Sequence, residues 1–333
     1  MPDDFTLEPA EALAARNPIR QLGESDEYRA ARQRLLVREY ELRRQIESIA
    51  AERRALPPGA EVTKDYRFEG EEGEVSLADL FGGHDAVFVY SYMFGPQRKN
   101  PCPMCTGFMQ ALAARNPIRQ IGESEEYRAA RQRLLVREYE LRRLTESVAA
   151  ERRALPPGPL LAQDYRLEGE EGEVSLSDLF GGHDSLWIYS YMFGPQRKNP
   201  CPMCTGFMNA LALRVPAIQA NMGIAFTARS PLARLVEAKR ELGMPDLPVY
   251  SDVSGDYTRD WVHPDDADLP GLNVFRKDGD WIRHFWSGEM TESDPGQDPR
   301  GAPEIDPLWA VLDMGPNGRR PDWYPSLNWA GRH

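Results

Sequence analysis

The stretch SLWIYSYMFGPQRKNPCPMCTGFMNALALRV, residues 185–215, decides the fold of this chain. Residues 185–192 are rich in β-branched and aromatic types, which predicts a strand, and FGPQRKNP predicts a loop. A helix is expected to begin at the first cysteine. If Cys201 is the N-cap, Pro202 takes the first helical position and Cys204 the third, which brings the two sulfurs within bonding reach. The stretch therefore predicts a dithiol at the start of a helix that follows a core strand.

The residues that follow predict the rest of an α/β domain. We expect strands at 223–228, 248–252, 272–276 and 281–286, and helices at 230–243 and 306–314. Residues 277–280, Lys-Asp-Gly-Asp, predict a hairpin between the last two strands. This order is typical of a thioredoxin-like three-layer sandwich, with its motif on the loop after the first core strand. We predict that residues 255–270 form a loop or an insertion, with no path through the fold assigned to it.

The expected position of Cys201 favours a thiolate. Free N–H groups and the positive end of the helix dipole stabilise negative charge, and Arg197 and Lys198 add positive charge nearby in sequence. Such settings lower a cysteine pKa from about 8.5 to about 3.5–7.5. We therefore expect Cys201 to attack a substrate disulfide or an oxidised sulfur, and Cys204 to resolve the mixed disulfide.

Pro270 is a further candidate for a supporting role. It precedes the strand predicted at 272–276, which a thioredoxin-like fold places beside the dithiol. A cis peptide bond and an ordinary loop proline are both compatible with this position.

A different class of function competes with redox chemistry. Cys102, Cys105, Cys201 and Cys204 together offer four thiolates, the ligand set of a structural zinc site. Each pair heads a predicted amphipathic helix, which argues against a zinc knuckle. We therefore expect no metal and no organic cofactor, and keep a non-catalytic, zinc-loaded binding or scaffold module as the alternative.

The chain contains one long repeat. Residues 12–110 and 111–209 are the same 99-residue sequence with 17 differences, and only the second copy continues, through residue 333. We predict a disordered N-terminus over 1–11, a truncated tandem duplicate over 12–110, and a complete domain over 111–333. Because the first copy lacks the second half of the fold, Cys102 and Cys105 are expected to be inactive.

Each copy begins with a long charged helix. Residues 124–155 predict one arm helix with Ser124 as N-cap and apolar residues every seven positions. Such an arm either pairs two molecules as a homodimer or lies on its own domain. In the first copy, a lone strand predicted at 86–92 cannot bury both faces unaided. We expect either poor order beyond about residue 60 or pairing with the edge of another sheet.

Charge and hydropathy exclude several partners. The net charge of −12 and the pI near 5.1 give nucleic acid no general attraction. The sequence shows neither a signal peptide nor an apolar run of membrane-spanning length. We expect a cytoplasmic protein whose partners are a disulfide or oxidised-thiol substrate and a reductant.

Several motifs together resemble a known family. They are FGGHDSLWIYSYMFGPQRKNPCPMCTGFM (180–208), ARSPLARL (228–235), LNVFRKDGDWIRHFW (272–286), DPGQDPRG (294–301) and DWYPSLNW (322–329). The chain resembles the thioredoxin-like family catalogued as domain of unknown function 899, predicted dithiol-disulfide oxidoreductases related to peroxiredoxins and thioredoxins. The resemblance covers about 116–333 completely and 17–110 for the first half only.

The resemblance implies a thioredoxin-like fold with Cys201 and Cys204 as the site. Thr205, after the second cysteine, resembles peroxiredoxin sites only loosely, so a peroxidase variant of the activity is a further hypothesis. The resemblance names no substrate. The additional half-unit at the front departs from the family.

Overall fold

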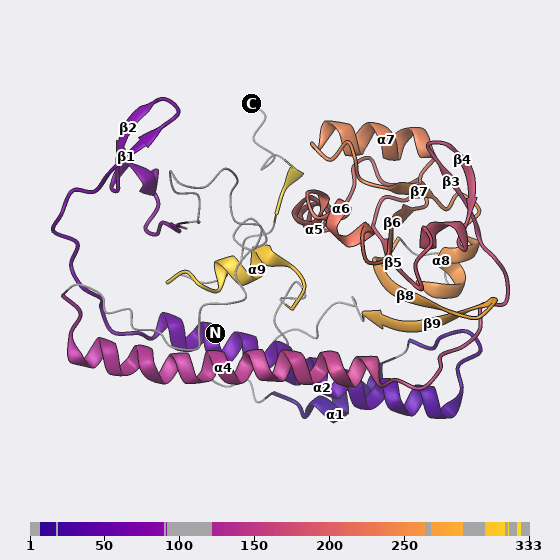
Figure 1. Ribbon diagram of the computed structural model, residues 1–333, viewed down its shortest axis with the longest axis horizontal. Coiled ribbons are helices and arrows are strands. Elements are labelled where there is room, and N and C mark those ends of the chain that lie inside the picture. The colour runs from indigo at the N-terminus through magenta and orange to yellow at the C-terminus, as the bar shows by residue number, and fades with distance from the viewer. Residues whose placement is uncertain are drawn as a thin grey trace. The chain divides into compact units, whose positions relative to one another are not determined.

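The computed structural model describes residues 7–17, 19–89, 91, 122–263, 268–288, 304–316, 319 and 325–327. Contacts within the chain divide it into two compact units. The sheet unit comprises Met1–Glu47, Leu144–Val311 and Arg319–His333. The hairpin unit comprises Ser48–Arg143 and Leu312–Gly318. Figure 1 labels the helices and strands of both.

The sheet unit is built on a seven-stranded sheet in the order β4-β3-β7-β6-β5-β8-β9. β5, β6 and β7 run parallel, and the other neighbours are antiparallel. The strands are β3 (Arg166–Gly169), β4 (Gly172–Ser175), β5 (Ser185–Ser190), β6 (Gly223–Ala228), β7 (Val249–Ser251), β8 (Gly271–Asp278) and β9 (Trp281–Gly288).

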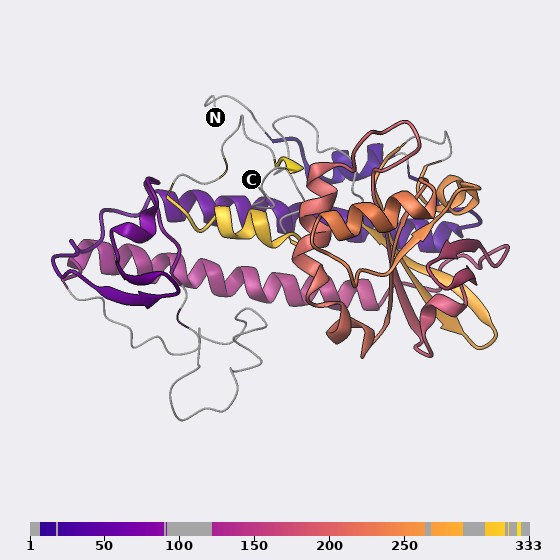
Figure 2. The ribbon, with the colours of Figure 1, turned by 90° about the horizontal axis from the view of Figure 1, so that it is seen from above.

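The helices of this unit connect or follow the strands. They are η2 (Asp178–Phe180), α5 (Pro202–Ala212), α6 (Val215–Gln219), α7 (Leu232–Glu241), α8 (Asp256–Trp261) and α9 (Pro307–Leu312). α7 packs against β7, and Figure 2 shows it lying across the strands. The parallel β5-α5-β6 unit and the antiparallel β8-β9 pair, in the order β6-β5-β8-β9, form a thioredoxin-like fold, as predicted.

Alternation along β5 decides what lies beneath the cysteine helix. Leu186 and Ile188 are fully buried in the core cluster on one face of the sheet, which also contains Phe275 of β8. Tyr189 points to the opposite face, because side chains alternate along a strand. There its ring centroid lies 5.0 Å from that of Phe207 on α5. The alternation of side chains along β5 therefore points Tyr189 toward α5.

One long helix lies near the start of each sequence copy, α2 (Asp26–Arg54) in the first and α4 (Glu125–Arg153) in the second. The short helix α1 (Ala10–Arg16) precedes α2. α4 matches the arm helix predicted over 124–155, and Ser124 Oγ accepts the Tyr127 N–H at 3.1 Å, as an N-cap does. α1 begins inside the range predicted as disordered, 1–11. No helix of the described residues is long and apolar enough to cross a lipid bilayer.

The first copy also forms a small two-stranded sheet. It consists of β1 (Arg67–Gly70) and β2 (Gly73–Ser76), followed by η1 (Asp79–Phe81). The prediction of a strand at 86–92 is wrong. The described residues of this range, 86–89 and 91, form no strand, and Phe88 and Val89 are more than half exposed. The cause is the lack of neighbours. In the second copy β5 pairs with β6 and β8, and the first copy ends before any such strands.

The stretch 255–270, predicted only as a loop or insertion, contains α8. Tyr257 and Trp261 of this helix are buried in the core cluster. Both rings pack edge to face against Phe275, with Trp261 at 5.3 Å and Tyr257 at 6.2 Å between ring centroids. This short helix closes the face of the sheet opposite α5.

Candidate active site

The backbone places Cys201 at the start of α5. Cys201 is the N-cap residue, with φ −60° and ψ 128°, and Pro202 is the first helical residue, as predicted. The Cys201 N–H donates to the Met192 carbonyl at 2.9 Å, and the Thr205 N–H donates to the Cys201 carbonyl at 2.9 Å. The first cysteine is thus fixed between the loop that leaves β5 and the first turn of the helix.

The surroundings of Cys201 favour its thiolate. Cys201 and Cys204 are free thiols, exposed by 9% and 4%. A hydrogen bond from the Cys204 thiol is the main cause that lowers the pKa of Cys201, to about 6. The backbone N–H groups of Cys204 and Met203 and the charge of Arg197 lower it further, against the opposing effect of burial. Cys201 is therefore largely ionised at neutral pH.

Cys204 has the opposite character. Donation of its proton to Cys201, burial, and the negative charge of Cys201 raise the pKa of Cys204 well above its ordinary value. Tyr189, 2% exposed, forms a hydrogen bond to Cys204 that lowers this pKa, as a hydroxyl donating to sulfur does. Burial raises the pKa of Tyr189 itself, so its hydroxyl keeps the proton. The pair therefore combines one thiolate and one thiol.

The loop before the cysteines is held by two residues from other elements. Asp268 accepts the Gly194 N–H at 3.0 Å and forms an ion pair with Arg197. Arg234 of α7 donates to the Arg197 carbonyl at 2.6 Å, and its guanidinium lies 4.5 Å over the Phe193 ring. These contacts hold Arg197 on the loop that leads to Cys201.

The other predicted supporting residues have different surroundings. Lys198 is exposed, and its carbonyl accepts from Arg234 at 3.4 Å. Thr205 is 1% exposed, and its hydroxyl has no hydrogen-bond partner within the described part of the chain. Pro270 immediately precedes β8, whose first residue, Gly271, pairs with Ser190 at the end of β5. Its peptide bond is trans, since the described residues contain no cis peptide.

Some predictions lie outside the described residues. Cys102 and Cys105 both do, so the first copy of the motif has no described geometry. Among the residues that are described, no three His, Cys, Asp or Glu side chains gather as metal ligands would.

Sequence reasoning missed four residues around the dithiol. Tyr189 and Tyr191 lie on or just after β5, and the charge of Cys204 acts on both phenols. Alternation along the predicted strand was the signal for Tyr189. Arg234 and Asp268 carry no such signal, because they reach the loop from distant parts of the sequence.

The solved structures to which this chain is similar are distant in sequence. The hypothetical protein SMc02350 of Sinorhizobium meliloti 1021 is 18% identical over 48% of this chain and 85% of its own, with a TM-score of 0.31. Xanthomonas campestris peroxiredoxin Q is 18% identical over 48% and 97%, with a TM-score of 0.32. A Chlorobium tepidum protein assigned as a thiol:disulfide interchange protein, DsbE, is 17% identical over 49% and 100%, with a TM-score of 0.31.

Comparison with curated proteins finds no match. One family model does match, that of the bacterial proteins of unknown function DUF899. It matches twice, over residues 18–118 and over residues 116–333. The second match contains the whole β5-to-α9 arrangement, and the first contains the arm helix and the β1–β2 hairpin. The chain belongs to the DUF899 family of bacterial proteins.

Proposed function

We propose that this protein is a thiol-disulfide oxidoreductase in which Cys201 is the nucleophile and Cys204 the resolving cysteine. One observation carries the proposal: Cys201 caps α5, with Cys204 in the same first turn, and this setting lowers the pKa of Cys201 to about 6. A thiolate attacks disulfides, and a thiol does not. A nearby second thiol then releases the substrate from the mixed disulfide.

The reaction has two exchange steps. The Cys201 thiolate attacks one sulfur of a substrate disulfide, and the other substrate sulfur leaves as a thiolate and takes up a proton from solvent. Cys204 then loses its proton to solvent and attacks Cys201 Sγ. The second substrate sulfur leaves and is protonated, and a Cys201–Cys204 disulfide remains. Two electrons have passed from the dithiol to the substrate, and an external dithiol reductant returns them by the reverse exchange.

The environment of Cys204 favours this order of events. While Cys201 is a thiolate, its charge and its acceptance of the Cys204 proton keep Cys204 protonated. Both effects end when Cys201 enters a mixed disulfide, because the charge is gone. The hydrogen bond from Tyr189 remains and favours the Cys204 thiolate. Cys204 is thus activated only after the first step.

The copy of the motif in residues 12–110 is proposed to be inactive. The argument is the strand that should lead into it. In the second copy β5 pairs with β6 and β8, whereas residues 86–89 of the first copy form no strand. The described residues before Cys102 therefore lack the paired strand that precedes Met192 and Cys201 in the second copy.

A redox titration with thiol trapping tests the proposal. The full chain carrying Cys102→Ser and Cys105→Ser is equilibrated in dithiothreitol buffers, alkylated and analysed by intact mass. We expect one two-electron transition from dithiol to disulfide, abolished by adding Cys201→Ser. The matched variant, which keeps Cys102 and Cys105 and carries Cys201→Ser and Cys204→Ser, should show no such transition. Inert thiols at Cys201 and Cys204 together with stoichiometric zinc would instead establish the binding-module alternative.

A further inference from the structure

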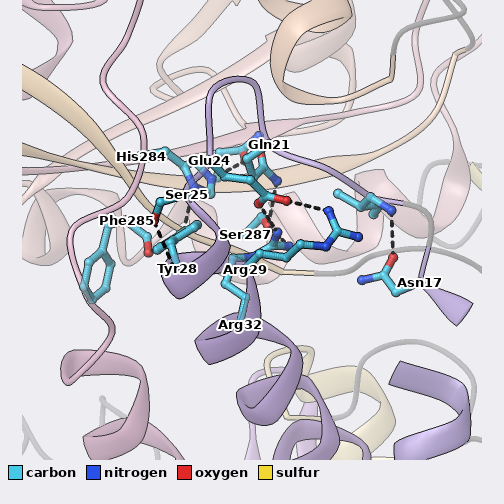
Figure 3. Close-up of polar contacts among 12 residues, drawn as sticks. Asn17, Gln21, Glu24, Ser25, Tyr28, Arg29, Arg32, His284, Phe285 and Ser287 are labelled. Carbon is cyan, nitrogen blue, oxygen red and sulfur yellow. Dashed lines mark hydrogen bonds and ion pairs between the residues drawn. The ribbon is translucent and has the colours of Figure 1, made fainter. Parts of the chain in front are cut away.

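In the sheet unit, one face of α2 covers the edge strand β9. The Tyr28 hydroxyl lies 3.0 Å from His284 Nδ1 and 2.9 Å from the Phe285 carbonyl oxygen (Figure 3). Arg32 Nη2 donates to Ser287 Oγ at 3.1 Å. Tyr28 is fully buried, and Arg32 is 8% exposed. α2 therefore docks on the edge strand through buried polar side chains.

An ion pair at the same surface holds Trp286 of β9. The indole N–H donates to Glu39 Oε1 at 3.1 Å, and the Arg152 guanidinium lies 4.2 Å from the centre of the Trp286 ring. Arg152 Nη2 is 2.5 Å from Glu39 Oε1. An acceptor at the N–H and a cation over the ring are the two contacts that suit an indole. Glu39 and Arg152 thus form a tryptophan-binding pair.

The hairpin unit contains the same ion pair, made by the repeat-equivalent residues. Glu138 is the counterpart of Glu39, and Arg53 is the counterpart of Arg152. Arg53 Nη2 lies 2.8 Å from Glu138 Oε1. The 99-residue repeat has therefore produced a second copy of the tryptophan-binding pair.

The surface around this second pair also repeats. Tyr127 is the counterpart of Tyr28, and a β-carbon built on Gly59 would lie 3.6 Å from Tyr127 Cε2. In the sheet unit, a β-carbon on the equivalent glycine, Gly158, would lie 3.1 Å from Tyr28 Cε2 and only 2.0 Å from the carbonyl oxygen of His284. The glycine that leaves room for β9 is therefore present at both surfaces.

The second surface has a cavity in place of a docked strand. A cavity of about 300 Å³ is lined by Arg53, Tyr127, Arg131, Leu135 and Glu138, among others. Side chains equivalent to those that bind β9 are more exposed here. Arg131 and Glu138 are 22% and 23% exposed, against 8% and 5% for the equivalents in the sheet unit.

The first sequence copy contains no strand equivalent to β9 that could cover this surface. The first copy runs only to residue 110, where the second begins, and β9 lies beyond the repeated sequence. The single β9 of the chain, residues 281–288, is already covered by α2. A second strand equivalent to β9 therefore has to come from another polypeptide.

We propose that this face of the hairpin unit binds the tryptophan-bearing edge strand of a second thioredoxin-like domain of the same family. The indole of that strand lies over Arg53 and donates its N–H to Glu138. The strand residue two before the tryptophan, equivalent to His284, faces Tyr127. The protein then serves as a docking partner for a complete family domain, in addition to its own dithiol.

A labelled peptide tests the docking directly. A backbone-cyclised hairpin with the sequence of residues 271–288 is titrated with the full chain, and fluorescence anisotropy reports binding. Saturable binding is expected, and Glu138→Ala should weaken it at least tenfold. The control variant Glu140→Ala, which removes a carboxylate of the same helix outside the cavity lining, should leave the affinity within about twofold. A peptide with Trp286→Ala should also bind at least tenfold more weakly.

Absence of binding, or binding that Glu138→Ala leaves unchanged, overturns the proposal. A second measurement needs no peptide. In the full chain, Tyr28→Ala and Glu39→Ala uncover β9, which stays paired with β8 and can then contact the hairpin unit of another molecule. Sedimentation velocity should show a concentration-dependent dimer, lost when Glu138→Ala is added. If this double variant has a native circular dichroism spectrum and stays monomeric, the proposal is also overturned. If the double variant does not fold, the peptide titration alone decides.

Discussion

The hydroxyl of Tyr189 lowers the pKa of the Cys204 thiol. The tyrosine belongs to β5 and the cysteine to the first turn of α5, so the two elements that carry the site meet at this pair. The effect of Tyr189 on Cys204 opposes that of Cys201. Tyr189 favours the Cys204 thiolate, whereas the hydrogen bond to Cys201 and the charge of Cys201 favour the thiol.

Tyr189→Phe should slow the second exchange step. Without the hydroxyl, the Cys204 thiolate loses one hydrogen bond, worth about 1 kcal/mol, so release of the mixed disulfide should be about fivefold slower. Stopped-flow measurement of product release after a single turnover checks this. Tyr191→Phe is the matched control, because its pKa is affected by Cys204 only through charge. Equal slowing by both substitutions would contradict the assigned hydrogen bond.

The alkylation rate of Cys201 should follow a pKa near 6. Because only the thiolate reacts, the iodoacetamide rate should rise with pH and reach half its plateau at about pH 6. Cys204→Ala removes the first of the causes and should shift the midpoint upward. A midpoint near the ordinary value of about 8.5 in the native chain would show that the helix start does not stabilise a thiolate.

Most of the fold was readable from the sequence, because its strands are bounded by clear loop and turn signals. The strand predicted over 185–192, the hairpin at 277–280 and the helix over 124–155 all occur near the expected bounds. The strand at 86–92 failed for a physical reason: a strand needs neighbours, and propensity alone carries no information about them. Helix α8 was missed because it is short and its apolar residues, Tyr257 and Trp261, look like parts of a loop.

The site was predictable where it is local in sequence. Cys201, Pro202 and Cys204 lie within one helical turn, so the N-cap geometry followed from their spacing. Asp268 and Arg234 were not predictable. They contact the loop across 71 and 37 positions of sequence, and only the folded sheet brings them together.

His284 should destabilise the fold in mild acid. Burial, together with the charge of Arg32, holds its pKa well below the ordinary value, so the folded state keeps it neutral. Neutral His284 carries its proton on Nε2, since Asn273 Oδ1 can only accept, and its Nδ1, 3.0 Å from the Tyr28 hydroxyl, carries none. As pH falls below about 6.5, the unfolded state takes up the proton and stability drops by up to about 1.4 kcal/mol per pH unit.

Urea unfolding of wild type and His284→Gln at pH 7.5 and pH 5 checks this prediction. The difference in unfolding free energy between the two chains should shrink at pH 5, because only the wild type loses stability by protonation. A difference that does not change with pH would mean that His284 takes up its proton as readily in the fold as in the unfolded chain.

Asp306 should destabilise the fold as pH rises, whereas His284 does so as pH falls. Burial raises its pKa to about 6, although its carboxylate accepts the Leu308 N–H at 3.0 Å. The folded state therefore binds a proton that the unfolded state has lost, and stability falls as pH rises from about 4 to about 6. Asp306→Asn keeps the acceptor and removes the charge. It should be more stable than wild type at pH 7 by about 2–3 kcal/mol, and nearly equal at pH 4.

Chemical denaturation at the two pH values measures that difference. His284 and Asp306 change the stability in opposite directions between pH 4 and 6. The contribution of each is therefore taken as the difference in unfolding free energy between its own variant and the wild type. An Asp306→Asn chain with no gain at pH 7 would place the carboxyl in contact with solvent.

Trapping of a mixed disulfide tests the central claim most directly. The chain carrying Cys102→Ser, Cys105→Ser and Cys204→Ser is mixed with oxidised glutathione, and intact mass is recorded. One glutathione adduct should accumulate on Cys201, since no resolving thiol remains to release it. The chain with Cys201→Ser in place of Cys204→Ser should stay unmodified. Equal adduct formation by both chains, or none by the first, would contradict the assignment of Cys201 as nucleophile and Cys204 as resolving cysteine.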